Sequence, residues 1–229
     1  GPGAASGRLH RGAFCLRSHR MSDAAGQDAH LLPIVEAWDE TAQLRGVRLG
    51  APPSLRARYH SPGQYLEVQD GSTRSYFALA AAPGDGALEI LVRRGSPLAD
   101  AVAALPATGG ALRVRDVLGR GFPLREQEGR NLVLVAAGSG IAPLRAVLQQ
   151  VLRRRERYGQ VALYYGQRQH EDLAYAAEFP RWREAGVQVL PVLSGERQGY
   201  VQDRLAAEPP PFLGEGTAAF LCGMREMMD

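Results

Sequence analysis

The chain has 229 residues, 45% apolar and 22% charged, which is ordinary for one or two globular domains, and no apolar stretch is long enough for a membrane-spanning helix. All 27 Lys plus Arg residues are arginines, which excludes the lysine-dependent sites of P-loop nucleotide-binding proteins, protein kinases and Schiff-base enzymes. The net charge is +3, but the acid-free first twenty residues alone hold four arginines, Arg8, Arg11, Arg17 and Arg20. The rest of the chain is therefore nearly neutral, and no nucleic-acid-binding surface is predicted.

The first segment, residues 1–30, is predicted to be a disordered leader or tag. Gly1-Pro2 resembles the scar of a cleaved purification tag, and the acid-free composition of residues 1–20 also fits an organellar targeting segment. The chain is therefore expected in the cytoplasm or, if a targeting segment is present, in an organellar matrix. Its two cysteines, Cys15 and Cys222, are too few for a Cys-ligated iron–sulfur cluster or a structural zinc site, and no metal site is predicted.

Residues 31–126 are predicted to form short strands separated by turns rich in Gly, Pro, Asp and Ser. One helix interrupts them, with Ser96 as its N-cap and Pro97 in its first turn. This spacing indicates an antiparallel barrel or sandwich. The expected strands are 31–38, 43–50, 63–69, 75–81, 86–94 and 111–117.

Residues 127–229 have a different pattern, in which apolar strands alternate with helices. Such alternation predicts right-handed βαβ units and a parallel sheet. The expected fold is thus two-domain, an antiparallel β-barrel followed by an α/β domain. The expected strands are 131–137, 160–166, 187–193 and 217–222, and the expected helices are 142–158, 172–185 and 200–208.

The sharpest motif is the turn Gly138-Ser139-Gly140-Ile141-Ala142-Pro143, which lies between a buried strand and a helix. Glycines let the backbone approach a phosphate closely, and the helix N-terminus offers free N–H groups. The nucleophile elbow G-x-S-x-G is absent because Ala137 stands two residues before Ser139, so a hydrolase is disfavoured.

Beside the barrel half, this turn resembles the ferredoxin–NADP reductase superfamily, whose members join an FAD-binding barrel to an NAD(P)-binding domain. The family's G-[ST]-G-I-[AS]-P loop is matched at every position. Its Y-G-x-R motif is matched by Tyr165 to Arg168, and its C-G-P-x-x-M motif by Cys222, Gly223 and Met227, with Met224 in place of Pro. The resemblance covers residues 31–229 and is closest to a plant and bacterial reductase-like branch that shares a P-G-Q-Y-L segment, here Pro62 to Leu66.

The flavin motif of the family, R-x-Y-[ST], is matched less completely by Arg74-Ser75-Tyr76-Phe77. The resemblance implies that Arg74 binds the FAD pyrophosphate and that Tyr76 packs on the isoalloxazine, while Phe77 replaces the hydroxyl near N5. Gly95-Ser96 corresponds to the second half of the pyrophosphate site. The competing interpretation makes Tyr76 and Phe77 barrel core and Arg74 a surface residue.

The resemblance also implies the cofactors, FAD with NADH or NADPH, and the roles of the remaining residues. Gly138, Ser139, Gly140, Ile141, Ala142 and Pro143 would hold the dinucleotide pyrophosphate. Gly166 and Arg168 would lie near the adenosine ribose. Cys222 and Gly223 would flank the nicotinamide, and Cys222 and Tyr76 would be the residues at the reacting rings.

The implied activity is hydride transfer from NAD(P)H to FAD, followed by electron transfer to an unidentified acceptor, with a protein among the candidates. Two alternatives stay open: an electron-transfer subunit that needs a partner enzyme, and a dinucleotide-binding module that has lost flavin. The family continues through a further helix and strand after the Cys-Gly motif, so the chain is expected to be truncated at Asp229.

Overall fold

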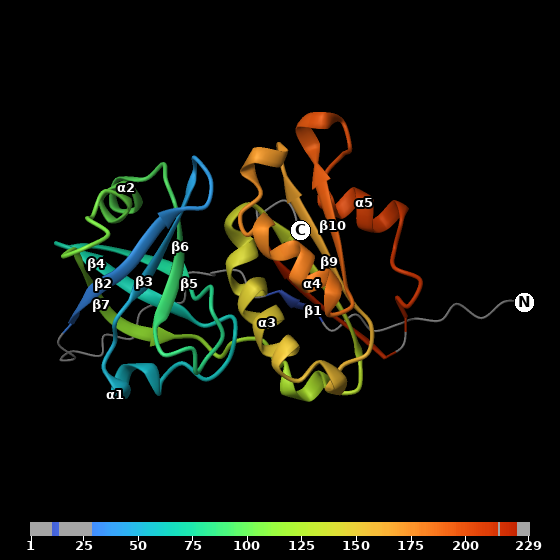
Figure 1. The fold of residues 1–229 in the computed structure, drawn as a ribbon, viewed down its shortest axis with the longest axis horizontal. Coiled ribbons are helices and arrows are strands. Elements are labelled where there is room, and N and C mark those ends of the chain that lie inside the picture. The colour runs from blue at the N-terminus through green and yellow to red at the C-terminus, as the bar shows by residue number, and fades with distance from the viewer. Residues whose placement is uncertain (1–10, 14–28, 215, 224–229) are drawn as a thin grey trace, which may run out of the picture.

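The computed structural model describes residues 11–13, 29–214 and 216–223. It contains two units side by side, a barrel of antiparallel strands and an α/β unit, as Figure 1 shows. The two-domain prediction of a barrel followed by a parallel-sheet domain is confirmed.

The barrel is built from six strands in the order β5-β4-β7-β2-β3-β6. Neighbouring strands pair antiparallel, and a bridge between Leu79 and Ile90 joins β6 to the segment after β5. The elements are β2 (His30–Asp39), β3 (Leu44–Leu49), α1 (Pro53–Arg56), β4 (Tyr65–Asp70), β5 (Thr73–Ala78), β6 (Leu88–Arg93), α2 (Pro97–Ala103) and β7 (Ala111–Leu118).

Helix α2 begins as its sequence predicts. The Ser96 hydroxyl accepts a hydrogen bond from the Ala99 amide at 3.3 Å, and Pro97 occupies the first turn. The one-turn helix α1 was not predicted, because its Pro-Pro-Ser sequence is also typical of turns.

The α/β unit has a parallel sheet in the order β1-β11-β8-β9-β10. Short 3-10 turns connect several of its elements. The strands and helices are β1 (Arg11–Ala13), β8 (Asn131–Ala137), α3 (Ile141–Arg153), β9 (Val161–Gln167), α4 (Phe179–Glu184), β10 (Val187–Leu193), α5 (Val201–Ala207) and β11 (Thr217–Cys222). The 3-10 turns are η1 (Arg125–Gln127), η2 (Gly138–Gly140), η3 (Arg155–Arg157), η4 (His170–Asp172), η5 (Ala176–Glu178) and η6 (Ser194–Glu196).

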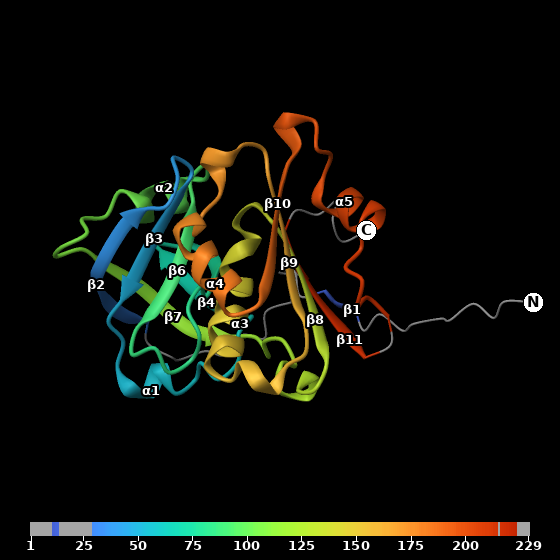
Figure 2. The ribbon, with the colours of Figure 1, turned by 45° about the vertical axis from the view of Figure 1, so that its right-hand side comes forward.

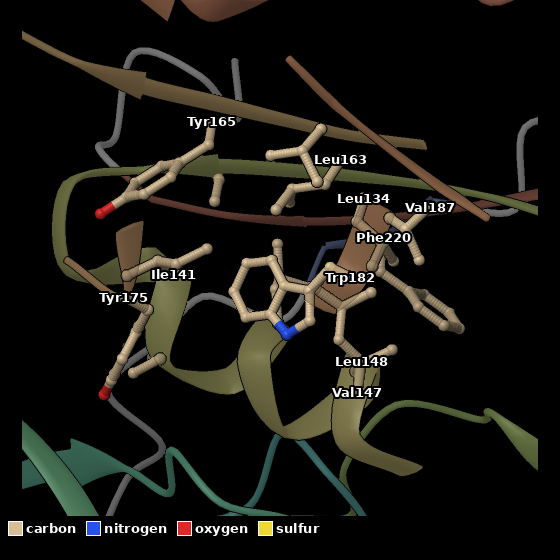
Figure 3. Packing of buried hydrophobic residues seen from close by; sticks show 14 of the residues in the cluster. Leu134, Ile141, Val147, Leu148, Leu163, Tyr165, Tyr175, Trp182, Val187 and Phe220 are labelled. Atoms are coloured by element: carbon tan, nitrogen blue, oxygen red, sulfur yellow. The ribbon is translucent and has the colours of Figure 1, made fainter. Parts of the chain in front are cut away.

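Helices cover both faces of this sheet, which explains why β8 is apolar from Leu132 to Ala137. Figures 1 and 2 show α3 and α4 on the side that faces the barrel and α5 on the other side. Trp182 of α4 lies between α3 and the sheet, and its side chain is 1% exposed (Figure 3).

Three segments differ from their predictions. The helix predicted over 142–158 ends at Arg153, and the 3-10 turn η3 follows it. Residues 11–13, within the predicted disordered leader, form β1, because an open edge of the parallel sheet satisfies their backbone groups beside β11. The helix predicted over 172–185 begins only at Phe179, because Tyr175 has the left-handed φ of 62° that interrupts a right-handed helix. Residues 1–10 and 14–28 of the predicted leader, which include Cys15, lie outside the described residues, as do Met224 and Met227.

The largest apolar cluster extends across both units. It unites side chains of the α/β sheet and α3 with Leu44, Ala80 and Leu91 of the barrel. Phe122, which follows the last barrel strand, stacks on Phe220 of β11 with ring centroids 4.8 Å apart. No helix in the described part of the chain combines the length and apolarity needed to cross a membrane.

Candidate active site at the domain boundary

A cavity of about 280 Å³ opens where the two units meet. Both units contribute to its wall. The barrel side is formed by Gly63, Tyr65, Ser75, Tyr76, Phe77, Ala78, Leu91, Arg93, Ser96, Ala99 and Phe122, and the α/β side by Ser139, Gly140, Ala142, Pro143, Cys222 and Gly223. Segments that are far apart in the sequence are thus brought to one site.

The glycine turn forms η2 and leads directly into α3, a helix of 13 residues without an acidic residue in its first turn. A Cβ added to Gly140 would collide with the carbonyl of Cys222, so the glycine allows the turn to lie against the end of β11. Gly138 has a φ of 58°, which favours glycine, and its missing Cβ would face open space. The start of α3, with its positive dipole end, therefore lies at the cavity wall, while the Ile141 amide donates within the turn to the Gly138 carbonyl.

Two tyrosines form the aromatic part of the barrel wall. Tyr65 and Tyr76 meet edge to face, with ring centroids 5.8 Å apart and planes at 85°. The Tyr76 hydroxyl donates a hydrogen bond of 3.4 Å to Glu67. Partial burial, and next the Glu67 carboxylate, raise the pKa of Tyr76, so the phenol stays protonated at neutral pH.

Arg74 does not line the cavity. Its guanidinium lies 3.3 Å from Glu67, a carboxylate on the neighbouring strand that is also 3.7 Å from Arg115. Phe77 is 9% exposed and belongs to the barrel core while also contributing to the cavity wall. Phe77 is therefore both a core residue and a lining residue of the cavity, and the two interpretations do not exclude each other.

Other predicted site residues also lie outside the lining. The Ile141 side chain is fully buried in the shared core, which leaves only its backbone for a ligand. Gly95, at the start of α2, donates its amide to Asp100 at 2.8 Å. A Cβ at Gly166 would lie 2.9 Å from that of Val201, so this glycine lets α5 approach β9. Arg168 is exposed just beyond β9.

Sequence reasoning missed two features of the wall. Arg93 at the end of β6 is the arginine among the described lining residues, and its place directly after the buried run from Leu88 to Val92 was the signal that could have placed it on the surface. Gln64 is 2% exposed, and its side chain holds the loop next to Gly63 in place. Its amide oxygen accepts hydrogen bonds from the backbone N–H groups of His60 and Ser61, and its amide nitrogen donates to the carbonyls of Arg58 and Gly119.

This chemistry suits the two cofactors. Aromatic rings, hydroxyls and a guanidinium on one wall can contact a flavin, and a glycine turn at a helix N-terminus on the other can contact a pyrophosphate. The described residues contain no cluster of three or more His, Cys, Asp or Glu side chains that could hold a metal ion.

The chain is similar to known oxidoreductases. Residues 134–229 match the family described as "Oxidoreductase NAD-binding domain". The reductase subunit of an aromatic O-demethylase from Amycolatopsis is 30% identical over 92% of this chain and 67% of its own length. The fruit protein pKIWI502 from Actinidia deliciosa is 26% identical over 80% of this chain, and the match spans 64% of that protein.

Solved structures agree. A cytochrome P450 reductase from Amycolatopsis superposes with a TM-score of 0.72 at 30% identity, covering 87% of this chain and 62% of that one. A ferredoxin NADP+ reductase from Neisseria gonorrhoeae with bound FAD and NADP superposes with a TM-score of 0.68 at 21% identity, covering 88% of each chain. The chain belongs to the ferredoxin–NADP reductase superfamily, a superfamily of NAD(P)H-dependent flavin oxidoreductases.

Proposed function

We propose that this chain binds FAD and a nicotinamide dinucleotide, takes hydride from NAD(P)H and passes electrons to a separate acceptor. The observation that carries the proposal is the cavity lined from both units, with barrel aromatics on one wall and the glycine turn and Cys222-Gly223 on the other. A ligand bound at the barrel wall and a ligand bound at the α/β wall would meet at the domain boundary.

On the α/β wall, the turn from Gly138 to Pro143 would hold the dinucleotide pyrophosphate. The absence of an acidic residue in the first turn of α3 leaves its positive dipole end available for an anion. The Ile141 side chain anchors the turn in the core, so only its backbone takes part. Gly166 supports the adenosine side by letting α5 approach, and Arg168 is the candidate contact to the ribose or a 2′-phosphate.

On the barrel wall, Tyr65 and Tyr76 would pack on the flavin, with Ser75, Phe77 and Ser96 beside it. Arg93 is the arginine within the lining. Arg74 adjoins Ser75 on β5, and we assign it to a phosphate of a flavin dinucleotide that extends beyond the lining. Gly95 gives the chain entering α2 its left-handed φ of 127°.

Bound FAD would supply hydride acceptance and the release of electrons singly or in pairs. The protein's own contribution is placement: the aromatic wall orients one ring, and Cys222 and Gly223 orient the other. Holding two reactants in contact removes much of the entropic barrier to their reaction.

We further propose that the acceptor is a protein. The Amycolatopsis relative is a reductase subunit, and a relative from Pseudomonas putida is an electron transfer component of toluate 1,2-dioxygenase. Because the matches span only about two thirds of several relatives, a partner-dependent subunit is the main alternative. Phe77, buried where the family carries a hydroxyl, motivates the second alternative, a module without flavin. The proposed compartment is the cytoplasm or an organellar matrix.

The test is an absorption spectrum of the purified protein before and after FAD is added, followed by anaerobic bleaching with NADH and with NADPH. We expect a flavin spectrum that one dinucleotide bleaches faster. A colourless protein that binds no FAD even in excess FAD would contradict the proposal and favour the dinucleotide-binding module without flavin. Reduction of an artificial acceptor by the isolated chain would argue against an obligate partner.

A further inference from the structure

A largely buried group of charges joins the two units. Arg145, in the second turn of α3, reaches the barrel in two ways: it pairs with Glu89 of β6 and donates to the Ala80 carbonyl at 3.1 Å. Within its own unit it pairs with Glu178 at 2.9 Å and lies over the Tyr175 ring, 4.4 Å from its centroid. Figure 3 shows Tyr175 beside the first turn of α3.

Glu89 is the barrel's half of this contact. It is 2% exposed, and its second partner is Arg48 at 3.3 Å. Burial raises the pKa of Glu89, and the guanidinium of Arg145 opposes that shift. Ionisation of the Glu89 carboxylate is therefore unfavourable at this buried position and depends on Arg145 and, next, on Arg48.

Stability alone does not account for the pair. Its surroundings are the shared apolar core, where apolar side chains of similar size often stabilise a fold as well as a buried ion pair does. A cation near the N-terminal end of α3 also opposes the helix dipole. What a buried ion pair supplies, and apolar packing does not, is one defined geometry between the groups that it joins.

The positions of Arg145 and Glu89 in the sequence indicate that the pair fixes the distance between the two cavity walls. Arg145 lies two residues after Pro143 on the same helix, and Glu89 lies two residues before Leu91 on the same strand. Pro143 and Leu91 line opposite walls of the cavity. Helix and strand are rigid, so a shift at the pair would be transmitted directly to the separation of the walls.

We infer that Arg145 and Glu89 are positioning residues that set the separation between the flavin wall and the dinucleotide wall, and thereby the rate of hydride transfer. The inference rests on the proposed function. Neither residue lines the cavity, so neither is expected to contact a cofactor.

Arg153 offers a matched control. It lies on the same helix and also reaches the barrel, donating to the Pro83 carbonyl at 2.6 Å and lying 4.0 Å from Asp85. Its side chain is 45% exposed, and it stands at the end of α3 away from the cavity. It shares the interface with Arg145 but not the proposed role.

The experiment compares Arg145→Met, Glu89→Leu, the double variant of both, and Arg153→Met. We expect each single variant at the pair to lower the urea midpoint, because a buried charge keeps only its second partner, Arg48 for Glu89 or Glu178 for Arg145, and the double variant to recover part of the loss. In the double variant, we expect the Kd for FAD to stay within about threefold and flavin reduction at saturating dinucleotide to slow at least about tenfold. Arg153→Met should reduce its flavin within about twofold of the wild-type rate.

A readout without cofactor is the exchange rate of the Ala82 amide, which donates across the interface to Gln149 of α3 at 2.8 Å. The double variant should exchange this amide faster than wild type. The inference is overturned if the double variant keeps the wild-type reduction rate, if Arg153→Met slows reduction equally, or if Ala82 exchange is unchanged. A wild-type protein that binds no FAD contradicts the proposed function instead, and the Ala82 measurement still tests the pair.

Discussion

The two walls of the cavity differ in whether backbone or side chains determine their shape. On the α/β side the wall depends on a close backbone approach, where the glycine turn lies against the end of β11. On the barrel side it is mainly side chains, led by Tyr65, Tyr76 and Arg93. A backbone wall tolerates almost no change in sequence, because only glycine fits a close approach, whereas a side-chain wall can exchange one group for another. This difference explains why the glycine motif is complete here and the flavin motif is not.

The sharpest test of the backbone wall is Gly140→Ala. We expect it to cost about 4 kcal/mol, above the ~1–3 kcal/mol usual for overpacking, because the Cys222 carbonyl that the new Cβ meets is backbone. Urea unfolding measures the loss. Gly138→Ala is the control: its Cβ faces open space, so only the positive φ should cost stability, about 1–2 kcal/mol. Equal losses would contradict the steric account of Gly140.

On the side-chain wall, Phe77→Ser restores the hydroxyl of the family motif. We expect it to destabilise the protein by about 3 kcal/mol, because Phe77 packs in the barrel core and its removal leaves a cavity. Thermal or urea unfolding gives the value. The control is Ser75→Ala, at an adjacent position on the wall that is not part of the core, which should change stability little. A neutral Phe77→Ser would show that the position tolerates either residue.

Tyr76→Ala removes an aromatic ring from the wall while leaving the fold intact. We expect FAD binding to weaken about tenfold, equivalent to about 1.4 kcal/mol, in a fluorescence titration. Tyr76→Phe keeps the ring and loses only the long hydrogen bond to Glu67, so it should bind FAD within about threefold of wild type. A larger loss for Phe than for Ala would mean that the hydroxyl, not the ring, matters.

The smallest expected effect is at Arg168, outside the lining. If it contacts a 2′-phosphate, Arg168→Ala should raise the KM for NADPH about fivefold and leave that for NADH unchanged, since an ion pair at an exposed position contributes up to about 1 kcal/mol. Steady-state kinetics with both dinucleotides provide the measurement. Equal changes with the two cofactors would remove Arg168 from cofactor selection.

Much of the fold was predictable because it follows local rules. Turn residues delimited the barrel strands, Ser96 and Pro97 marked the start of α2, and unbroken apolar runs marked the parallel strands. The glycine turn was predictable for the same reason. Its requirement is steric and lies in consecutive residues.

The features that escaped prediction depend on contacts between distant segments. The pairing of Arg74 with Glu67 needs the register of β4 against β5, and the pairing of Arg145 with Glu89 joins residues from different units. The strand β1 is only three residues long and takes its stability from β11. No local pattern encodes such partners.

The apolar cluster that contains Leu44, Ala80 and Leu91 together with α3 and the α/β sheet has a consequence for how the protein comes apart. Since neither unit can lose its partner without exposing part of a common core, heat should melt both in one transition with a calorimetric enthalpy that matches the van't Hoff value. A barrel recombined with a foreign nucleotide domain would have to acquire a new apolar surface before it could dock.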